Sequence, residues 1–272
     1  WPCSACTHCR KPTPAANNGP MSWRKTYAGA EPQRVNKWLA AEGVCSRREA
    51  EALIGKGLVS IDGARVDDPG RKIERGQTIE VGDGNARPQI SIVINKPAGI
   101  VSAQPEGGQI PAARLLTRAN LIGAPRNMPT KRTRLAPLGR LDQDSRGLLL
   151  LSEDGVLAKA VIGPESKLDK EYLVSVAGQI TEKKLTLLRH GLALDGRQLK
   201  PADVSVIEKQ RLRFVLLEGR NRQIRRMCEL VDLDVTDLLR IRIGPLHLQN
   251  LPEGKWRALT GAERDAMIAA SR

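Results

Sequence analysis

The chain has 272 residues, with 44 lysines and arginines against 30 aspartates and glutamates, and a formal net charge of +14. Its isoelectric point near 10 indicates a polyanionic partner. Because no segment approaches the roughly 18 apolar residues that span a bilayer, nucleic acid is favoured over a membrane. The length is enough to bury a substantial core, and we expect two domains in a cytoplasmic protein.

Residues 1–33 are expected to form a tail of low order. This tail holds a group with the spacing of metal ligands, made of Cys3, Cys6, His8 and Cys9. A second ligand pair at suitable spacing is lacking, so we expect no metal site there. Because Trp1 stands in place of a methionine, we interpret the residues before Met21 as read-through of upstream sequence. The apolar segment of a secretory signal is not found.

Residues 34–82 predict a small unit of two short helices and a small sheet. The segment from Ser46 to Glu49 has the pattern of a capping box, which starts the second helix. Asp62 and Gly63 predict the tight turn of a hairpin between two short strands.

This segment resembles the S4-type RNA-binding module shared with a ribosomal small-subunit protein. The pattern R-x-x-K-x-L…G…S-R-R-x-A…G-x-V-x-x-x-G is matched in order from Arg34 to Gly63. The resemblance implies that one helical face grips RNA phosphates through Arg34, Lys37, Arg47 and Arg48. The residues alone also fit a solvated charged face balanced by Glu42, Glu49 and Glu51.

Residues 83–89 are rich in Gly, Asp, Asn and Pro and are predicted to be a linker. We expect a second domain over residues 90–262 and a C-terminal tail over residues 263–272. The second domain opens with isoleucines at alternate positions, which predict a strand that ends at a Lys-Pro-Ala-Gly turn. We interpret this turn as architectural, with a phosphate contact by Lys96 left open.

A long basic insertion lies between Val101 and Leu135, and no Asp or Glu occurs from Gly107 to Leu141. It is a candidate for substrate choice, with RNA contacts expected from Arg126, Lys131, Arg132 and Arg134. The alternative is a disordered basic loop, and a loop that orders on RNA satisfies both interpretations.

Helices and strands are predicted in irregular order through the rest of the chain. Strands are expected at residues 172–176 and 212–217, and a helix from about Arg222 with Ile224, Met227 and Cys228 on its buried face. Because a regular βαβ alternation is missing, the pattern favours an α+β fold over a doubly wound sheet.

The most informative segment begins at Gly139. The run Gly-Arg-Leu-Asp-Gln-Asp-Ser-Arg-Gly places Asp142 in a turn-forming stretch that leads directly into four leucines. A turn held by a buried strand is suited to fixing a reactive side chain at the edge of a pocket. Alone, the same pattern also fits a polar turn before a core strand.

In its longer context this segment closely resembles the catalytic motif of the RsuA-type pseudouridine synthases, which isomerise uridine to pseudouridine in ribosomal RNA. Further matches follow in the family's order, Lys-Glu-Tyr-Leu-Val at residues 170–174 and Gly-Arg-Asn-Arg-Gln-Ile-Arg-Arg-Met at residues 219–227. They look closest to the RluF-like branch, which modifies large-subunit rRNA and has members that also act on tRNA. The resemblance implies a catalytic domain built on a mixed, mainly antiparallel sheet with flanking helices.

The resemblance implies that Asp142 is the catalytic carboxylate. It either attacks C1′ of the ribose or removes a sugar proton to give a glycal, and the sequence leaves both routes open. Either route needs an ionised carboxylate in a desolvated pocket. A neighbouring cation offsets the free-energy cost of removing this charge from water. Arg225 resembles the family's basic partner of the aspartate, and its alternative role is a surface charge on a helix.

Tyr172 resembles the family tyrosine that stacks on the target base and takes part in transfer of the C5 proton. A strand tyrosine on its own also fits half-buried core. The substrate-binding residues implied by the resemblance are Arg140, Arg220, Asn221 and Gln223. Asp144 and Ser145 are interpreted as hydrogen-bonding residues of the turn, because two carboxylates so close in sequence have no controlled separation for glycosidase chemistry.

We therefore predict a cofactor-free, monomeric RNA pseudouridine synthase that flips a uridine out of ribosomal RNA, with the large subunit as the expected substrate and tRNA as a second substrate class. Two alternatives stay open. One is a non-catalytic rRNA-binding ribosome assembly factor that keeps the fold, and the other is an RNA N-glycosidase that uses Asp142.

Overall fold

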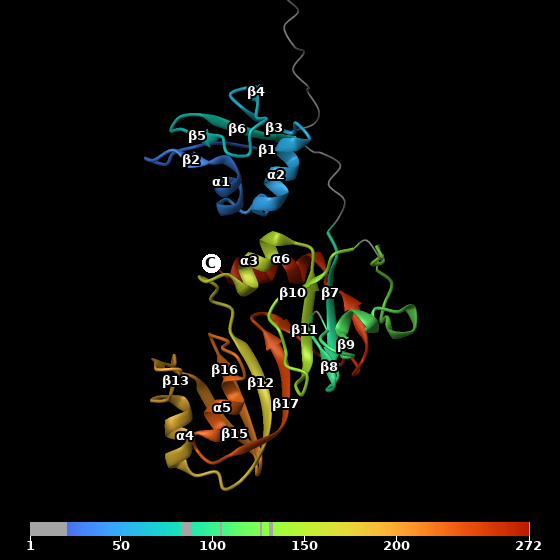
Figure 1. The fold of residues 1–272 in the computed structure, drawn as a ribbon, viewed down its shortest axis with the longest axis vertical. Coiled ribbons are helices and arrows are strands. Elements are labelled where there is room, and N and C mark those ends of the chain that lie inside the picture. The colour runs from blue at the N-terminus through green and yellow to red at the C-terminus, as the bar shows by residue number, and fades with distance from the viewer. Residues whose placement is uncertain (1–20, 83–88, 104, 126, 131–132, 272) are drawn as a thin grey trace, which may run out of the picture. The chain divides into compact units, whose positions relative to one another are not determined.

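The computed structural model of the chain describes residues 21–82, 89–103, 105–125, 127–130 and 133–271. The chain divides into two compact units, Trp1–Arg87 and Pro88–Arg272 (Figure 1). Their boundary falls within the segment whose composition predicts a linker, of which residues 83–88 lie outside the described part. None of the helices formed by the described residues is both long and apolar enough to cross a membrane.

In the N-terminal unit two helices share one core with a small antiparallel sheet. The helices are α1 (Val35–Ala41) and α2 (Arg47–Gly55). The sheet has the order β1 (Met21–Thr26), β6 (Thr78–Gly82), β3 (Val59–Ile61) and β4 (Ala64–Arg65), beside a separate pair of β2 (Gln33–Arg34) and β5 (Lys72–Ile73). The predicted capping box at the start of α2 is confirmed, because Ser46 Oγ accepts from Glu49 N–H while Ser46 N–H donates to the Glu49 carboxylate.

The expected tail is wrong over its last residues, because β1 pairs antiparallel with β6. The segment lacks a clear apolar alternation and is stabilised by tertiary packing instead. Trp23 and Tyr27 lie edge-to-face against Trp38 of α1, with ring centroids 5.6 and 5.4 Å away. Aromatic pairs of this geometry stabilise by about 0.5–1.5 kcal/mol beyond the area they bury. The metal-like cluster of the tail, Cys3, Cys6, His8 and Cys9, lies outside the described residues.

The second unit is built on a nine-stranded sheet. Its main path runs β15 (Asp203–Glu208), β16 (Arg211–Leu216), β12 (Lys170–Ala177), β17 (Asp234–Ile243), β11 (Arg146–Ser152), β7 (Ser91–Lys96) and β19 (Trp256–Ala258), while β10 (Ala136–Pro137) pairs with β11 and β18 (Leu246–His247) with β17. All pairs are antiparallel except β11 with β17. The predicted α+β class with a mixed, mainly antiparallel sheet is confirmed.

The four leucines of β11 are buried on both faces of this sheet. Leu149 and Leu151 belong to the core shared with α4 (Glu182–Arg189) and α5 (Gln223–Glu229), whereas Leu148 and Leu150 belong to the core shared with α3 (Gly155–Ile162) and α6 (Gly261–Ala270). Side chains alternate across a strand, so a strand covered on both sides must be apolar at every position. The run of leucines therefore marks the centre of the unit.

The C-terminal segment is a helix, which corrects the expected tail over residues 263–272. Thr260 and Glu263 form a capping box at the start of α6. Met267 is fully buried, and Arg264 Nε donates to Asp154 Oδ2 at the N-terminus of α3. This capping box and the burial of Met267 stabilise the helix where a tail was expected.

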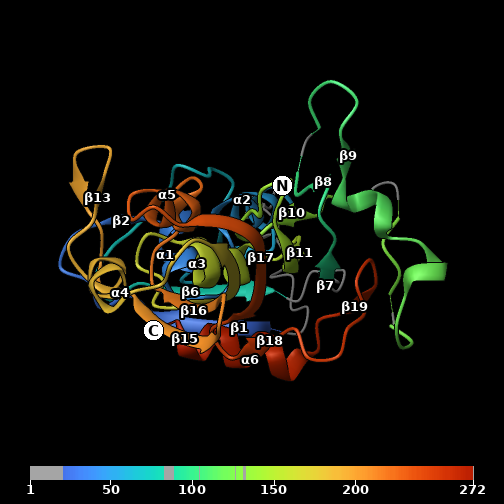
Figure 2. The same cartoon turned by 90° about the horizontal axis from the view of Figure 1, so that it is seen from below.

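The basic insertion lies at the edge of the sheet formed by β19, next to β7 (Figures 1 and 2). It contains a parallel pair of β8 (Ile100–Val101) with β9 (Ile110–Pro111) and two 3₁₀ turns, η1 (Ala112–Leu115) and η2 (Arg118–Asn120). Trp256 anchors it, because its Nε1 donates to Thr117 O at 2.8 Å. Of the basic residues expected to contact RNA here, Arg134 is exposed. The others, Arg126, Lys131 and Arg132, lie outside the described residues.

Gly147 lies at the start of β11, directly after the turn that holds Asp142, and pairs with Arg240 of β17. Its φ is +105°, and a Cβ there would lie 2.3 Å from Arg240 O. We expect Gly147→Ala to lower the free energy of unfolding by about 3 kcal/mol or more, because a rigid backbone clash adds to the left-handed strain. Urea unfolding followed by circular dichroism measures the loss.

Gly196→Ala is the matched control. Gly196 also has a positive φ of +70°, but no heavy atom lies within 4 Å of the added Cβ. Only the strain remains there, and a loss of about 1 kcal/mol is expected. Equal losses in the two variants would contradict the close approach of β11 and β17 at this point.

Candidate active site

A cavity of about 520 Å³ opens in the second unit. Its walls come from the segment 139–145, the end of α3, the start of β12, the end of β16, the loop before α5, and β17. The lining residues that concern the chemistry are Arg140, Asp142, Lys170, Tyr172, Arg222, Arg225 and Arg240. A cavity of this size is typical of sites for small ligands or for one unit of a polymer.

The turn that carries Asp142 is fixed by a hydrogen bond within the turn and by hydrogen bonds with Ser102 of the insertion. Ser145 N–H donates to Asp142 O at 3.2 Å. Ser102 Oγ accepts from Leu141 N–H at 2.8 Å and donates to Leu141 O at 2.6 Å. The Asp142 side chain is 36% exposed at the cavity wall. The carboxylate of Asp142 therefore lies at the edge of a pocket, where the sequence analysis expects it.

Arg240 lies beneath this turn and escaped the sequence analysis. It is almost fully buried on β17, and its Nε and Nη2 donate to Leu148 O and Gly139 O at 2.8 and 2.9 Å. Its guanidinium thus joins both ends of the segment around Asp142. In sequence it stands beside Arg242 in an alternating strand, and nothing local distinguishes the buried arginine from the partly exposed one.

Lys96 is a second buried cation under the same turn. Its Nζ donates to Pro97 O at 2.8 Å and to Ile100 O at 2.6 Å. Burial lowers the pKa of Lys96 to about 8, against the opposing charges of Asp144 and Asp142. Because the side chain is fully buried, the phosphate contact considered for it is wrong, whereas an architectural role in the turn agrees with these bonds.

Two arginines of the α5 segment face the turn, and the structure corrects which one approaches Asp142. Arg225 pairs with Asp144, with Nε 3.3 Å from Oδ2, and its Nη2 donates to Asp144 O at 2.9 Å. Arg222 Nη1 lies 3.8 Å from Asp142 Oδ2. Arg222 has left-handed backbone angles just before the helix, with φ 48° and ψ 32°, a local geometry that a helical sequence pattern does not reveal.

Asp144 is more than a hydrogen-bonding residue of the turn. Arg222 Nη1 and Nη2 donate to its two carboxylate oxygens at 3.3 and 3.0 Å. Burial raises the pKa of Asp144, but the hydrogen bond from Arg222 and the charges of Arg225 and Arg222 outweigh it and leave the pKa below its ordinary value. Asp144 is thus an ionised group that holds two guanidinium groups at the site.

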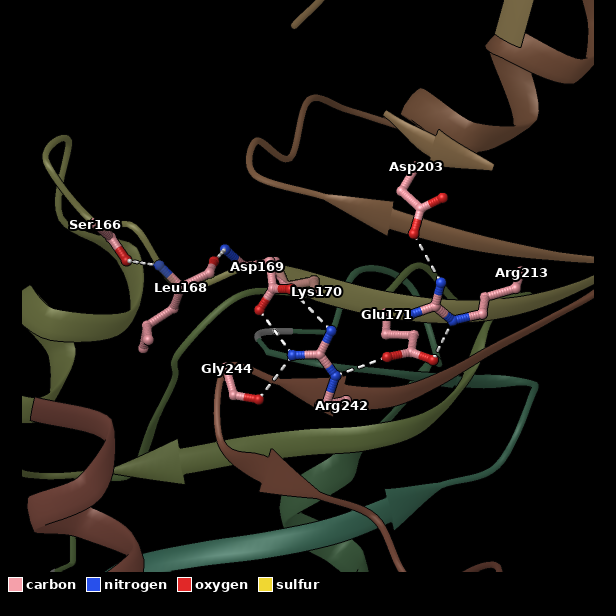
Figure 3. Close-up of polar contacts among 9 residues, drawn as sticks. All are labelled: Ser166, Leu168, Asp169, Lys170, Glu171, Asp203, Arg213, Arg242 and Gly244. Atoms are coloured by element: carbon pink, nitrogen blue, oxygen red, sulfur yellow. Dashed lines mark hydrogen bonds and ion pairs between the residues drawn. The ribbon is translucent and has the colours of Figure 1, made fainter. Parts of the chain in front are cut away.

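Tyr172 lies in the cavity wall, as predicted, on the buried face of β12 and 9% exposed. The preceding residue, Glu171, faces away from the cavity into an ionic network. Its carboxylate accepts from Arg213 Nε and Arg242 Nε, both at 2.7 Å, and Arg242 also pairs with Asp169 (Figure 3). The network fixes the start of β12, and so the place of Tyr172. Lys170 also lines the cavity, and burial followed by the charge of Arg240 lowers its pKa.

The predicted substrate-binding residues divide into two kinds. Arg140 and Asn221 are exposed and line the cavity. Arg220 and Gln223 line the cavity as well. Arg220 also donates to the carbonyls of Leu194, Arg197 and Gln198 in the hairpin of β13 (Ala193–Leu194) and β14 (Arg197–Gln198). Gln223 is buried, and its Oε1 accepts from Arg220 N–H. These bonds make Arg220 and Gln223 supports of the loop in this structure.

In the N-terminal unit the predicted phosphate contacts are all exposed, and all lie at or near the starts of the two helices: Arg34, Lys37, Arg47 and Arg48. The alternative was a solvated face in which three glutamates balance these basic residues, but the three glutamates are bound to other groups. Glu42 pairs with Lys25, Glu49 caps α2, and Glu51 accepts from the buried Asn36. Within the described residues, no carboxylate forms an ion pair with the four basic side chains.

Each of the two units matches a known protein family. The RNA pseudouridylate synthase family matches residues 90–230, and the S4 domain matches residues 33–79. The chain is 35% identical over 235 residues to a dual-specificity RNA pseudouridine synthase RluF of Salmonella typhi, covering 85% of this chain and 76% of that protein. It is 33% identical to a ribosomal large subunit pseudouridine synthase B of Bacillus subtilis, covering 85% and 93%.

The fold has a solved counterpart. A crystal structure of a pseudouridylate synthase aligns with a TM-score of 0.59 at 25% identity, covering 86% of this chain and 99% of the other. The chain therefore belongs to the RNA pseudouridylate synthase family. It is an RNA pseudouridine synthase with an N-terminal S4 domain, on the RluF-like side of the family.

Lys96 gives the stability of this unit a characteristic pH dependence. An unfolded lysine keeps its proton up to about pH 10.5, whereas folded Lys96 loses it near pH 8. Between these values the unfolded state binds more protons, so the free energy of unfolding rises with pH. Relative to Lys96→Met, the wild type should gain about 2 kcal/mol from pH 7 to pH 10, measured by urea unfolding.

Lys209→Met is the control, because Lys209 is exposed and its substitution leaves this pH dependence in place. Parallel stability curves for the wild type and Lys96→Met over the same range would show that burial of the ammonium group does not carry the effect.

Proposed function

We propose that this protein isomerises one uridine to pseudouridine in large-subunit ribosomal RNA, as a monomer and without a cofactor. The observation that carries the proposal is the cavity in which the carboxylate of Asp142 lies beside the guanidinium of Arg222 and shares the wall with Tyr172. The names of relatives support the substrate class, since one is a large-subunit rRNA synthase and another is called dual-specificity. tRNA is the second substrate class to test.

The reaction breaks the N1–C1′ glycosidic bond and forms a C5–C1′ bond. C5 loses a proton to a base, N1 gains a proton, and no electrons are exchanged with another molecule. The uracil must rotate while it stays in the site, and a base inside a duplex is out of reach, so the nucleotide is flipped into the cavity. Arg140 and Asn221, exposed at the wall, are suited to hold the flipped nucleotide.

Asp142 supplies the carboxylate for this chemistry, by attack on C1′ or by removal of a sugar proton. The guanidinium of Arg222, 3.8 Å away, and the buried Lys96 supply positive charge near this carboxylate. Arg225 acts in the same site through Asp144. Tyr172 offers a ring for stacking on the uracil and a hydroxyl for transfer of the C5 proton.

The S4 domain supplies affinity for RNA phosphates. Arg34, Lys37, Arg47 and Arg48 are exposed and their neighbouring glutamates are bound elsewhere, so their charge is free to meet a polyanion. The basic insertion, including Arg134, adds a second positively charged region for RNA.

Asp142→Asn should abolish isomerisation while RNA binding is retained. Without the carboxylate neither route to the broken glycosidic bond is open, and we expect the rate to fall on the order of 10⁴-fold or more. Release of tritium from RNA labelled at C5 of uridine measures turnover, and carbodiimide-blocked primer extension maps the product in total rRNA.

The same assay separates the alternatives. An assembly factor that keeps the fold without catalysis makes no pseudouridine in the wild type, and Asp142→Asn leaves rRNA maturation unchanged. An RNA N-glycosidase releases free uracil and leaves an abasic site, which strand cleavage at high pH detects. Either result would remove the proposed activity.

Replacing Arg47 and Arg48 by Gln should weaken RNA binding and reduce its salt dependence. Each lost phosphate contact lowers the slope of log K against log salt by about 0.7–0.9, so the double variant should lose up to about 1.8. The turnover number at saturating RNA should stay unchanged, because the cavity belongs to the other unit. Fluorescence anisotropy over a salt series gives the slope.

Arg75→Gln is the control for that experiment, since Arg75 is exposed in the same unit but lies in the turn before β6. It removes one positive charge without touching α1 or α2. A double variant with an unchanged slope, or a control with an equal loss per residue, would contradict a localised phosphate contact on the helices.

A further inference from the structure

Two carboxylates and two guanidinium groups form one cluster beside the cavity, and they do not pair one to one. Asp144 contacts both arginines, whereas Asp142 contacts only Arg222, at 3.8 Å. Nη1 of Arg222 contacts both carboxylates, because it lies 3.8 Å from Asp142 Oδ2 and donates to Asp144 Oδ1 at 3.3 Å. Arg222 is therefore shared between the reacting carboxylate and a neighbour that has no assigned role.

Arg222 needs a partner to stay in this place. Its side chain is 44% exposed, and a free arginine has about 2 kcal/mol of rotamer entropy to lose when it is fixed. A bidentate pair with a carboxylate sets both the position and the plane of the guanidinium. Asp144 provides this pair through both of its oxygens.

Asp144 is itself fixed from the opposite side by Arg225. The Arg225 side chain is 14% exposed, and its Nη1 and Nη2 donate to Val235 O and Asp144 O at 3.2 and 2.9 Å. The backbone of the turn is thus bound to β17 through one guanidinium. The carboxylate that projects from the same residue then orients the other guanidinium.

The pair between Asp144 and Arg222 matters when RNA is bound, because RNA phosphates also bind arginine. A phosphate that approaches the cavity competes with Asp142 for an exposed arginine, and it brings a negative charge that disfavours a second ionised carboxylate nearby. An arginine already held in a bidentate pair is less available to the phosphate. Asp144 also repels the phosphate directly, so its presence weakens RNA binding while it protects the site.

We propose that Asp144 is a positioning residue, which holds the guanidinium of Arg222 beside Asp142 and keeps it from the RNA backbone. This inference rests on the proposed function, because Asp142 is the group that benefits. Asp144 itself does not touch the reacting atoms. It acts through Arg222, and its effect should disappear when Arg222 is absent.

Asp144→Asn tests the proposal through a split between kcat and KM. The amide cannot hold a guanidinium in a charged bidentate pair, so kcat should fall about tenfold or more. KM for RNA should stay the same or decrease, because a negative charge at the site is removed and Arg222 is released to a phosphate. A general loss of structure would instead raise KM and lower the melting temperature. Asp144→Glu, which restores the carboxylate, should recover part of kcat.

A double-mutant cycle with Arg222→Gln gives the sharper result. If Asp144 acts through Arg222, adding Asp144→Asn to Arg222→Gln should change kcat less than about twofold. Additive losses would overturn the proposal, as would a kcat of Asp144→Asn equal to that of the wild type. Should Asp144→Asn fail to fold, Arg222→Gln alone decides, because the proposal requires it to lower kcat about tenfold or more.

Asp195→Asn is the matched control. Asp195 makes the same kind of bidentate pair with Arg226 of the same helix, at 2.6 and 3.0 Å, and lies in the turn of the β13–β14 hairpin. It should leave kcat unchanged. A wild type that makes no pseudouridine contradicts the proposed function, whereas an active wild type with a fully active Asp144→Asn contradicts only the role of Asp144.

Discussion

The catalytic unit depends on the compensation of charge in and beneath one turn. Arg240 and Lys96 are buried under residues 139–147, and each bonds to backbone carbonyls and to no carboxylate in the described part of the chain. A buried ion without compensation destabilises by several kcal/mol. The carboxylates of Asp142 and Asp144 supply opposite charge to Lys96. The backbone bonds of these two cations fix the path of the turn, and the carboxylates add favourable charge above it.

The partners of this turn come from distant parts of the chain. Lys96 ends β7, Arg240 lies in β17, and Arg222 and Arg225 belong to the segment of α5. The parallel pairing of β11 with β17, with Gly147 opposite Arg240, brings the first and last of these elements together. The absence of a side chain at Gly147 allows this approach. The site is thus a product of sheet topology, and it forms only when the whole unit folds.

Much of the fold could be read from the sequence, because capping residues, turns and a doubly buried strand leave local signals. The strand β1 left none, since its pairing with β6 and the packing of Trp23 depend on tertiary structure. The helix α6 did leave a signal, in Thr260 and Glu263, that composition obscured. In the site, Asp142 and Tyr172 line the cavity as expected. The ion pairs of Asp142 with Arg222 and of Asp144 with Arg225 were not predictable, because they depend on the left-handed backbone of Arg222 and on a carboxylate two positions from Asp142.

The arginines around the cavity and the basic residues of the S4 domain differ in whether they are already bound to protein groups. Guanidinium groups that already donate to protein oxygens, as those of Arg220, Arg222, Arg225 and Arg240 do, contribute less to the attraction of phosphates. A pocket whose cations serve its own carboxylates therefore needs affinity for RNA from elsewhere. The S4 domain has the complementary arrangement. Glu42, Glu49 and Glu51 are bound to other groups, and among the described residues no carboxylate forms an ion pair with the exposed Arg34, Lys37, Arg47 and Arg48. Exposed, unpaired basic residues on the helices of the S4 domain can therefore bind RNA phosphates without competing for the cations that surround Asp142.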